Sequence, residues 1–267
     1  MQFDDTNGLA NYNDMLTHMS TWAKNWQLPL SVTKCCCMRV SNRAISIPLS
    51  LTLANSPLIE ISELKDLGVI FNSKLSFTNH ISAIIGKAKQ RLFLLNKSFV
   101  CKDAKILITA YKTYVIPILD YCSPVWSPYY ASDIKRIESV QKGFTGHLIG
   151  YSGLNYGDRL VKAGLCTLEL RRLHADLVLC FKIIHGMTDI KTDSMFLLDD
   201  SQLTRGHSWK LRSYKPRLDT SLHFFAYRTV AVWNKLMPAT VCAQTVQSFK
   251  TCLLKEDLSS FMLENRK

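Results

Sequence analysis

The spacing of apolar residues predicts a helix near the beginning of the chain. From residue 8 to residue 26, apolar side chains recur every three or four positions, which places them on one face of an α-helix. We expect this helix to pack on a sheet and to end before Pro29, whose ring cannot continue it. The predicted apolar face consists of Leu9, Tyr12, Met15, Leu16, Met19, Trp22, Ala23 and Trp26.

Short strands are predicted to follow this helix. Apolar residues alternate with smaller or polar ones, which is the period of a half-buried strand. Lys34 falls inside the first predicted strand, and the exposed edge of a sheet is the ordinary place for such a lysine. The predicted strands cover residues 28–40, 45–53, 58–61 and 66–70.

Helical spacing dominates the rest of the sequence. A long helix is predicted to begin near Ser76, and Gly186 is well placed to end a later one. We expect the proline-bearing segment 116–130 to be a non-regular connection, and Ser132 or Asp133 to cap the next helix. The predicted fold class is therefore α+β and mainly α. The other predicted helices cover residues 103–115, 167–185, 221–236 and 245–264.

Composition and charge narrow the possible functions. The 267-residue chain is 47% hydrophobic and 20% charged, which is typical of a globular protein. Its formal net charge of +12 favours a polyanionic partner, with nucleic acid as the first candidate and a basic protein without such a partner as the alternative. No apolar run is long enough for a membrane span, and no secretory signal is recognisable. We therefore expect an intracellular protein, cytoplasmic or nuclear, that is not secreted.

Positive charge is concentrated between Lys87 and Lys142, where ten Lys or Arg residues outnumber four Asp or Glu residues. Helices that carry basic side chains opposite an apolar face can follow a phosphate backbone, and such binding weakens with salt. A solvated basic surface is the alternative interpretation. The predicted nucleic-acid-binding residues are Lys87, Lys89, Arg91, Lys97, Lys135, Arg136 and Lys142.

Two adjacent carboxylates, Asp4 and Asp5, follow Phe3. On a tight turn both carboxylates can point at one divalent cation or at two, and such hard oxygen ligands suit Mg²⁺. A pair of Mg²⁺ ions can hold the attacking and leaving oxygens of a phosphoryl transfer. A solvated turn without a metal is the alternative for this pair.

Several short motifs occur in an order that resembles the reverse transcriptases of non-LTR, jockey-like retrotransposons. The first group is Phe3-Asp4-Asp5, Trp26, Lys34, Asp66-Leu67-Gly68-Val69 and Leu75-Ser76-Phe77-Thr78-Asn79-His80-Ile81. The second group is Tyr121–Pro128, Asp133-Ile134, Ile137–Lys142, Leu168–Arg172, Thr204–His207 and Trp233-Asn234. Each motif is short, but the ordered set covers nearly the whole chain.

The resemblance implies an RNA-directed DNA polymerase that uses an RNA template, a DNA primer and two Mg²⁺ ions. In that family, the residues matching Asp4 and Asp5 are the catalytic, metal-binding pair. The lysine matching Lys34 lies near the incoming nucleotide and is proposed to protonate the leaving pyrophosphate. His80 is expected to make a structural hydrogen bond rather than bind a ligand.

The resemblance also divides the chain into regions. Residues 1–75 match the end of the polymerase palm, 76–150 match the thumb, which grips the template–primer duplex, and 151–267 form a helical C-terminal region. Within the first region, the residues that match the hairpin holding the primer terminus are Leu67, Gly68 and Val69.

Two departures from the family pattern shape the functional expectation. The family's turn has one residue between its aromatic and its Asp-Asp pair, whereas Phe3 directly precedes Asp4. The family's fingers and first half of the palm precede that turn, and they do not fit before residue 4. We therefore expect a fragment of the polymerase that is inactive alone, with two alternatives: a non-catalytic basic nucleic-acid-binding module, or the product of a pseudogene.

Overall fold

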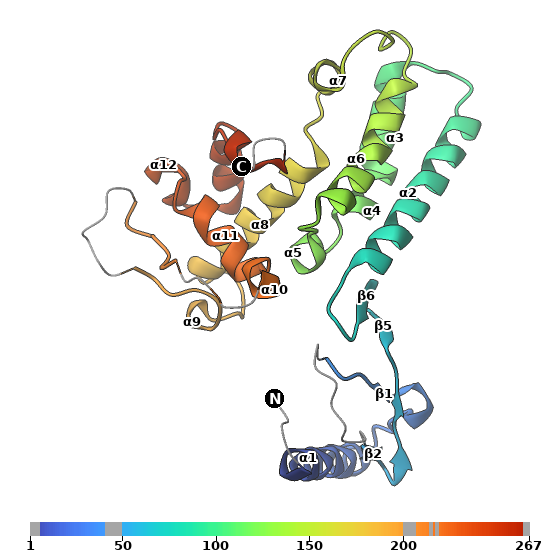
Figure 1. Cartoon of the computed structure of the whole chain (residues 1–267), viewed down its shortest axis with the longest axis vertical. Coiled ribbons are helices and arrows are strands. Elements are labelled where there is room, and N and C mark those ends of the chain that lie inside the picture. Colours follow the sequence, from blue (N-terminus) through green and yellow to red (C-terminus); the bar gives the residue numbers. More distant parts are fainter. Residues whose placement is uncertain (1–5, 41–49, 200–206, 214–215, 217–218, 264–267) are drawn as a thin grey trace. The chain divides into compact units, whose positions relative to one another are not determined.

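The computed structural model describes residues 6–40, 50–199, 207–213, 216 and 219–263 (Figure 1). Two compact units divide the chain, Met1–His80 and Ile81–Lys267. The predicted α+β, mainly helical fold class is confirmed. Asp4, Asp5, most of the predicted strand 45–53 and Thr204–Gly206 lie outside the described residues. Among the helices that are described, none combines the length and the apolar character that a bilayer span requires.

The first unit opens with the predicted amphipathic helix, α1 (Thr6–Asn25). Its inward side meets strand β2 (Thr52–Leu53), where the Asn13 side-chain amide donates to the Ser50 carbonyl at 3.1 Å and accepts from the Thr52 amide at 3.0 Å. The predicted burial of the apolar face is wrong for half of its members, because two-residue strands cover only a narrow side of a helix. Ala23 is buried, whereas the exposed members are Met15, Met19, Trp22 and Trp26.

The described strands of this unit form three small two-stranded sheets. β1 (Cys36–Cys37) runs parallel to β4 (Ile59–Glu60), and β2 pairs with β3 (Ser56–Pro57) in an antiparallel hairpin. The predicted strand 28–40 is therefore wrong over most of its length. Lys34 ends a 3₁₀ turn, η1 (Val32–Lys34), whose first backbone bond runs from the Lys34 amide to the Ser31 carbonyl.

A longer hairpin ends the unit. β5 (Glu63–Asp66) and β6 (Val69–Asn72) pair antiparallel, with Asp66 opposite Val69. The predicted strand 66–70 thus spans the turn, because the reversal falls at Leu67 and Gly68, which both have positive φ angles. The hairpin leads into helix α2 (Thr78–Ser98), which begins two residues after the predicted Ser76.

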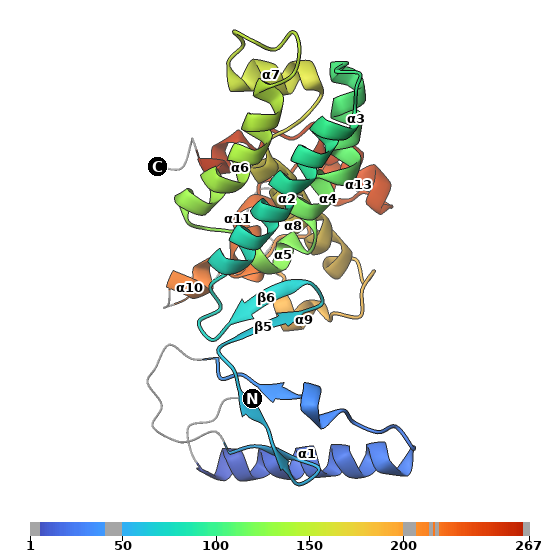
Figure 2. The same ribbon diagram turned by 90° about the vertical axis from the view of Figure 1, so that its right-hand side faces the viewer.

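The second unit begins with helices that lie side by side in both views (Figures 1 and 2). These are the rest of α2, then α3 (Ala104–Tyr114) and α6 (Ala131–Gly146), while α7 (Tyr156–Ala163) packs against α6. The apolar residues Ile134, Ile137 and Val140 of α6 are buried. Its cap is Tyr130, not Ser132 or Asp133. Asp133 instead pairs with Arg136 one turn later.

The predicted non-regular connection contains two short helices, α4 (Ile116–Asp120) and α5 (Ser123–Trp126). Pro117 and Pro124 lie in their first turns, where a missing N–H breaks no helical hydrogen bond. The prolines therefore start these helices instead of preventing them. Trp126 is fully buried, and its indole N–H donates to the Tyr121 carbonyl at 2.7 Å.

Helix α8 (Leu168–Ile184) is the centre of the second unit and contacts α4, α5, α6 and two later helices. Its predicted boundaries are confirmed: the Thr167 hydroxyl accepts from the Leu170 amide, and Gly186 has a φ of 63° just beyond the end. The two predicted C-terminal helices are shorter than expected. The remaining elements are α9 (Thr192–Met195), α10 (Asp219–Leu222), α11 (Phe225–Trp233), α12 (Pro238–Val241), α13 (Val246–Leu253) and η2 (Ser259–Phe261).

A single apolar core joins α8 to α11 and α13. Phe181 stacks on Phe249 with ring centroids 4.3 Å apart, and Trp233 packs against the same ring at 6.1 Å. Burial of each such aromatic side chain removes a large apolar area from water, which makes this cluster a main source of stability for the unit. Its members also include Leu177, Cys180, Ile183, Leu211, Phe225, Val230, Leu236, Val241 and Leu253.

Candidate nucleic-acid interface

The three predicted catalytic residues are not brought together by the described structure. Asp4 and Asp5 lie outside it, and Lys34 is exposed at the end of the η1 turn. The described residues bring no three His, Cys, Asp or Glu side chains into a cluster that could hold a metal ion.

The β5–β6 turn presents Leu67 to solvent. Leu67 has a φ of 44°, Gly68 a φ of 91°, and the Leu67 side chain is 84% exposed. Positive φ angles at both central residues define the hairpin turn that matches strand twist, a turn that favours Asn-Gly or Gly-Gly. A leucine held there is strained, and such strain gathers at functional sites. Val69, by contrast, is buried at the start of β6.

The residues of the Leu75–Ile81 motif fix this hairpin to the start of α2. His80 is buried, and its Nδ1 accepts the Ile70 amide at 3.3 Å, so the predicted structural hydrogen bond is confirmed. The Asn79 amide donates to Glu63 at 2.6 Å, and Phe77 meets Phe71 edge to face at 5.7 Å. Together these contacts hold the turn in a fixed position on its own unit.

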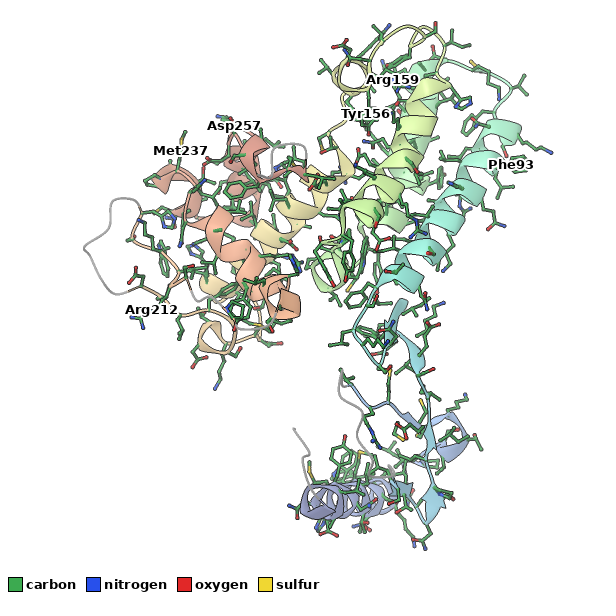
Figure 3. The ribbon with its side chains drawn as sticks, in the orientation of Figure 1. Phe93, Tyr156, Arg159, Arg212, Met237 and Asp257 are labelled. Atoms are coloured by element: carbon green, nitrogen blue, oxygen red, sulfur yellow. The ribbon has the colours of Figure 1, made fainter. Side chains whose placement is uncertain are left out.

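The basic residues predicted on α2 are all exposed. Lys87 and Arg91 are one turn apart on one flank of the buried stripe, while Lys89 lies on the opposite flank. Lys97 lies over the ring of Phe93, with its Nζ 4.7 Å from the ring centroid, and Phe93 is itself 57% exposed (Figure 3). An exposed aromatic ring beside a lysine suits contact with nucleic-acid bases as well as phosphates.

On α6, the predicted basic residues have different roles. Lys135 and Lys142 are exposed two turns apart. Arg136 donates to Asp133 at 2.8 Å and to the Ser82 hydroxyl of α2 at 2.7 Å, so it links the two helices. Gly143, which directly follows Lys142, has nothing within 4 Å of the place where a Cβ would lie. This stretch of α6 is therefore open to a ligand backbone.

Helix α7 adds basic groups that the sequence reasoning missed. The Arg159 guanidinium lies 5.7 Å from the Tyr156 ring centroid (Figure 3), and a Cβ at Gly146 would meet its NH1 at 2.6 Å. Lys162 donates to the Gly150 carbonyl at 2.6 Å. No periodic signal marks these residues in the sequence, because their positions depend on how α7 packs on α6.

A largely buried polar network links α6 to α3, α7 and the start of α8. The Tyr156 hydroxyl donates to Glu138, and the same carboxylate accepts the Leu168 amide at 3.0 Å. Desolvation by burial raises the pKa of Glu138, although the hydrogen bond from Tyr156 opposes the shift. Gln141 joins the network by accepting from the Tyr111 hydroxyl at 3.2 Å. These groups are partly or fully buried, and they position the helix.

The chain is similar in sequence to RNA-directed DNA polymerases of mobile elements. Over 139 residues it is 28% identical to the RNA-directed DNA polymerase from mobile element jockey of Drosophila melanogaster and 26% identical to that of Drosophila funebris; each match covers 51% of this chain. The probable RNA-directed DNA polymerase from transposon X-element of Drosophila melanogaster is 26% identical over 135 residues, 48% of this chain. The chain is related to non-LTR retrotransposon reverse transcriptases.

This relationship covers a limited part of the relatives. The matched stretches amount to 14% of the X-element polymerase and 15% of each jockey polymerase. An uncharacterized Caenorhabditis elegans protein is also similar, at 24% identity over 42% of this chain and 58% of its own length. No family model matches the chain, and no solved structure matches it.

Proposed function

We propose that this chain forms the part of a reverse transcriptase that holds the template–primer duplex. The supporting observation is the set of exposed basic side chains on α2 and α6, in a chain related to RNA-directed DNA polymerases. Lys87 and Arg91 on α2, with Lys135 and Lys142 on α6, are the proposed phosphate contacts. The ligand is an RNA template paired with a DNA primer. Such a ligand places the protein's action in the cytoplasm or the nucleus.

The proposal assigns one part of the polymerase to each region that was inferred from the resemblance. Residues 1–75 form the end of the palm, 76–150 the thumb and 151–267 the C-terminal region. Leu67, at the strained turn, is the proposed contact to the primer terminus, and Gly68 allows the backbone to approach closely. Val69 anchors the turn through its burial.

Polymerisation is proposed for the polymerases to which the chain is related, and not for this chain by itself. Asp4 and Asp5 would hold Mg²⁺, which stabilises developing negative charge on phosphates when bound, and Lys34 would act near the incoming nucleotide. Asp4 and Asp5 lie outside the described residues, so we derive no step through the ion. The matched stretches are a small part of the polymerases, so the activity of the whole polymerases is not carried over to this chain.

Salt-dependent duplex binding tests the proposal. We expect the anisotropy of a fluorescein-labelled RNA–DNA hybrid to report binding whose log affinity falls linearly with log salt. The double variant Lys87→Gln/Lys135→Gln should flatten that slope by about 2, since each lost phosphate contact removes about 0.9. The matched control is Lys250→Gln/Lys255→Gln, which removes two exposed lysines in and just after α13 and should leave the slope unchanged.

Three results would contradict the proposal. A flat plot of log affinity against log salt, or equal slopes for the two double variants, would remove the duplex contact from α2 and α6. Mg²⁺-dependent primer extension by the 267-residue chain that disappears in Asp4→Ala would show that the chain polymerises alone.

A further inference from the structure

A cavity of about 190 Å³ lies between α8, α11 and the segment after α5. One water molecule needs about 15 Å³ and drug-sized pockets begin at about 300 Å³, so the cavity suits a ligand of one or two rings. Arg172 and Asp176 line the cavity and are buried, while its partly exposed lining includes Glu169, Tyr129, His223 and Phe261. The cavity therefore opens to solvent.

The Arg172 guanidinium is the unusual group in this cavity. It is 2% exposed, and both of its terminal nitrogens lack a hydrogen-bond partner among the described residues. A buried donor without an acceptor costs roughly 1–3 kcal/mol, and more when it is charged. The structure thus holds a planar set of donors that a ligand could satisfy.

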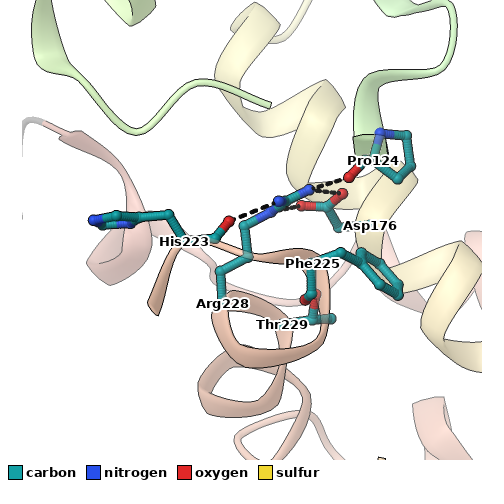
Figure 4. A network of polar contacts seen from close by, with 6 residues as sticks. All are labelled: Pro124, Asp176, His223, Phe225, Arg228 and Thr229. Atoms are coloured by element: carbon teal, nitrogen blue, oxygen red, sulfur yellow. Dashed lines mark hydrogen bonds and ion pairs between the residues drawn. The ribbon is translucent and has the colours of Figure 1, made fainter. Parts of the chain in front are cut away.

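The neighbouring ionic groups are already paired. Arg228 donates from Nε and NH2 to both oxygens of Asp176, at 2.8 and 2.9 Å, and its remaining bonds go to the carbonyls of Pro124 and His223 (Figure 4). Asp120 pairs with Arg171, and Glu138 is engaged in the α6 network.

Arg172 nevertheless has carboxylates around it. It feels the attraction of Glu138, Glu169, Asp120 and Asp176, although burial still lowers its pKa. A phosphate or carboxylate ligand would add negative charge beside these carboxylates. What the guanidinium lacks is acceptor atoms and not an opposite charge, so a neutral ligand with two adjacent acceptors fits best.

The walls favour a flat aromatic ligand. Tyr129 stacks on His223 with ring centroids 4.1 Å apart and planes at 4°, and Tyr130 packs on Tyr129 at 4.1 Å. The rings on the lining that a base could stack on are therefore those of His223 and Phe261. Unpaired bases of single-stranded nucleic acid bind by stacking on such rings. A guanidinium pairs with the O6 and N7 acceptors of guanine.

We propose that this cavity binds one unstacked guanine base of a single-stranded nucleic acid, with Arg172 donating to its O6 and N7 edge. The choice of nucleic acid as the source of the base rests on the proposed function. The site is separate from the lysines of α2 and α6. It would select a guanine in a template loop or end, where bases are free to leave the stack.

Nucleotide analogues test the site without any duplex. We expect guanosine 5′-monophosphate to bind the full chain in a calorimetric titration, and 7-deazaguanosine 5′-monophosphate, which lacks the N7 acceptor, to bind at least about fivefold more weakly. Inorganic phosphate alone should not bind at the same concentration. Because duplex contact by the lysines is not involved, this result stands or falls independently of the duplex-binding test.

A matched pair of variants identifies the residue. Arg172→Lys keeps the charge but loses the planar fork, and should lose the preference for guanosine 5′-monophosphate over its 7-deaza analogue. Arg171→Lys, whose side chain pairs with Asp120, should keep it. Equal affinities for the two nucleotides in the unsubstituted protein, no nucleotide binding, or binding of inorganic phosphate alone would each overturn the proposal, whether or not the variants fold.

Discussion

Leu67 shows how one residue can be placed against its local preference. Its φ of 44° costs a non-glycine residue about 1–2 kcal/mol relative to an ordinary conformation, and its 84% exposure returns almost no apolar burial. A stable hairpin is therefore not the reason for leucine at this position. The proposed contact with the primer terminus explains the leucine physically, because the bound primer would cover its exposed apolar side chain.

Replacing this residue should separate stability from binding. Leu67→Asn creates the Asn-Gly pair that this turn prefers, and we expect it to stabilise the hairpin by about 1 kcal/mol. Hydrogen exchange of the Ile70 amide, which lies in β6, measures the local opening free energy. Slower exchange together with weaker template–primer binding is the expected result. Faster exchange of that amide would show that the leucine is held by contacts the proposed role does not include.

His207 gives a second prediction at this scale, because its ionisation is linked to folding. It is 5% exposed, its Nε2–H donates to the Trp233 carbonyl at 3.1 Å, and burial lowers its pKa below 6.5. Below that pH the unfolded chain binds a proton more readily than the folded chain, so stability falls as the pH falls.

Urea unfolding at pH 7.5 and pH 5.5 measures this linkage. We expect the free energy of unfolding to be smaller at pH 5.5, and the difference to shrink in His207→Gln, whose amide can still donate to the carbonyl. Burial also lowers the pKa of His174, so part of the difference should remain. An unchanged difference in the variant would assign the whole effect to other groups.

At the scale of elements, α8 is joined to α11 by the buried pair of Arg228 and Asp176. Asp176 is almost fully buried, with 4% of its side chain exposed, and Arg228 supplies two of its hydrogen bonds. Removing the arginine leaves a buried carboxylate without its counter-ion, which is far more costly than removing both partners.

The pair gives a graded set of variants. Arg228→Met should lower the free energy of unfolding by about 3 kcal/mol, and Arg228→Met/Asp176→Leu should recover much of that loss. Arg212→Met serves as the control, since Arg212 is exposed (Figure 3) and substitutions at such positions change stability by less than about 0.5 kcal/mol. A double variant that is less stable than Arg228→Met would show that the ion pair itself stabilises the two helices.

The elements also show where periodicity predicts well. For α8, the spacing of leucines, the cap at Thr167 and the glycine at 186 agree, and the observed helix has those boundaries. For α1, the same kind of spacing predicts the helix but not the burial of Met15, Met19, Trp22 and Trp26. Periodicity reports that a side of a helix is apolar, whereas burial depends on the size of the element that covers it.

At the scale of the whole molecule, the two units have very different cores. The buried apolar residues of the first unit are Ala23, Leu51, Leu53 and Val69 among those described, and its sheets have two strands each. Two-stranded hairpins are marginally stable in water. The second unit buries the aromatic cluster around Phe181, Trp233 and Phe249.

We therefore expect the units to unfold separately. In urea, peptides from residues 6–72 should lose hydrogen-exchange protection at a lower concentration than peptides from α8 and α13, which violates two-state behaviour. Duplex should raise the concentration at which the second unit unfolds, since a ligand stabilises the state that binds it. Coincident transitions for all peptides would show that the units fold as one cooperative body.

Some motifs that carry the family resemblance are hydrogen-bonded to one another, in addition to being candidate sites. His207 bonds to the carbonyl of Trp233, and the Asn234 side chain exchanges two hydrogen bonds with Leu211. Leu168 donates its amide to Glu138, which comes from another motif. The order of motifs in the sequence therefore predicted the lineage, while these pairings between motifs follow from the packing of α8 and α11.

The sequence by itself determined the lineage, the mainly helical class, the boundaries of α8 and the exposed lysines of α2 and α6, because local periodicity and charge are properties of neighbouring residues. Only the tertiary structure decided the roles of Arg136 and Arg172. One links α2 to α6, and the other is buried on α8 without a hydrogen-bond partner among the described residues. Both arginines look like ordinary basic residues in the sequence, since their partners and their burial come from helices far along the chain.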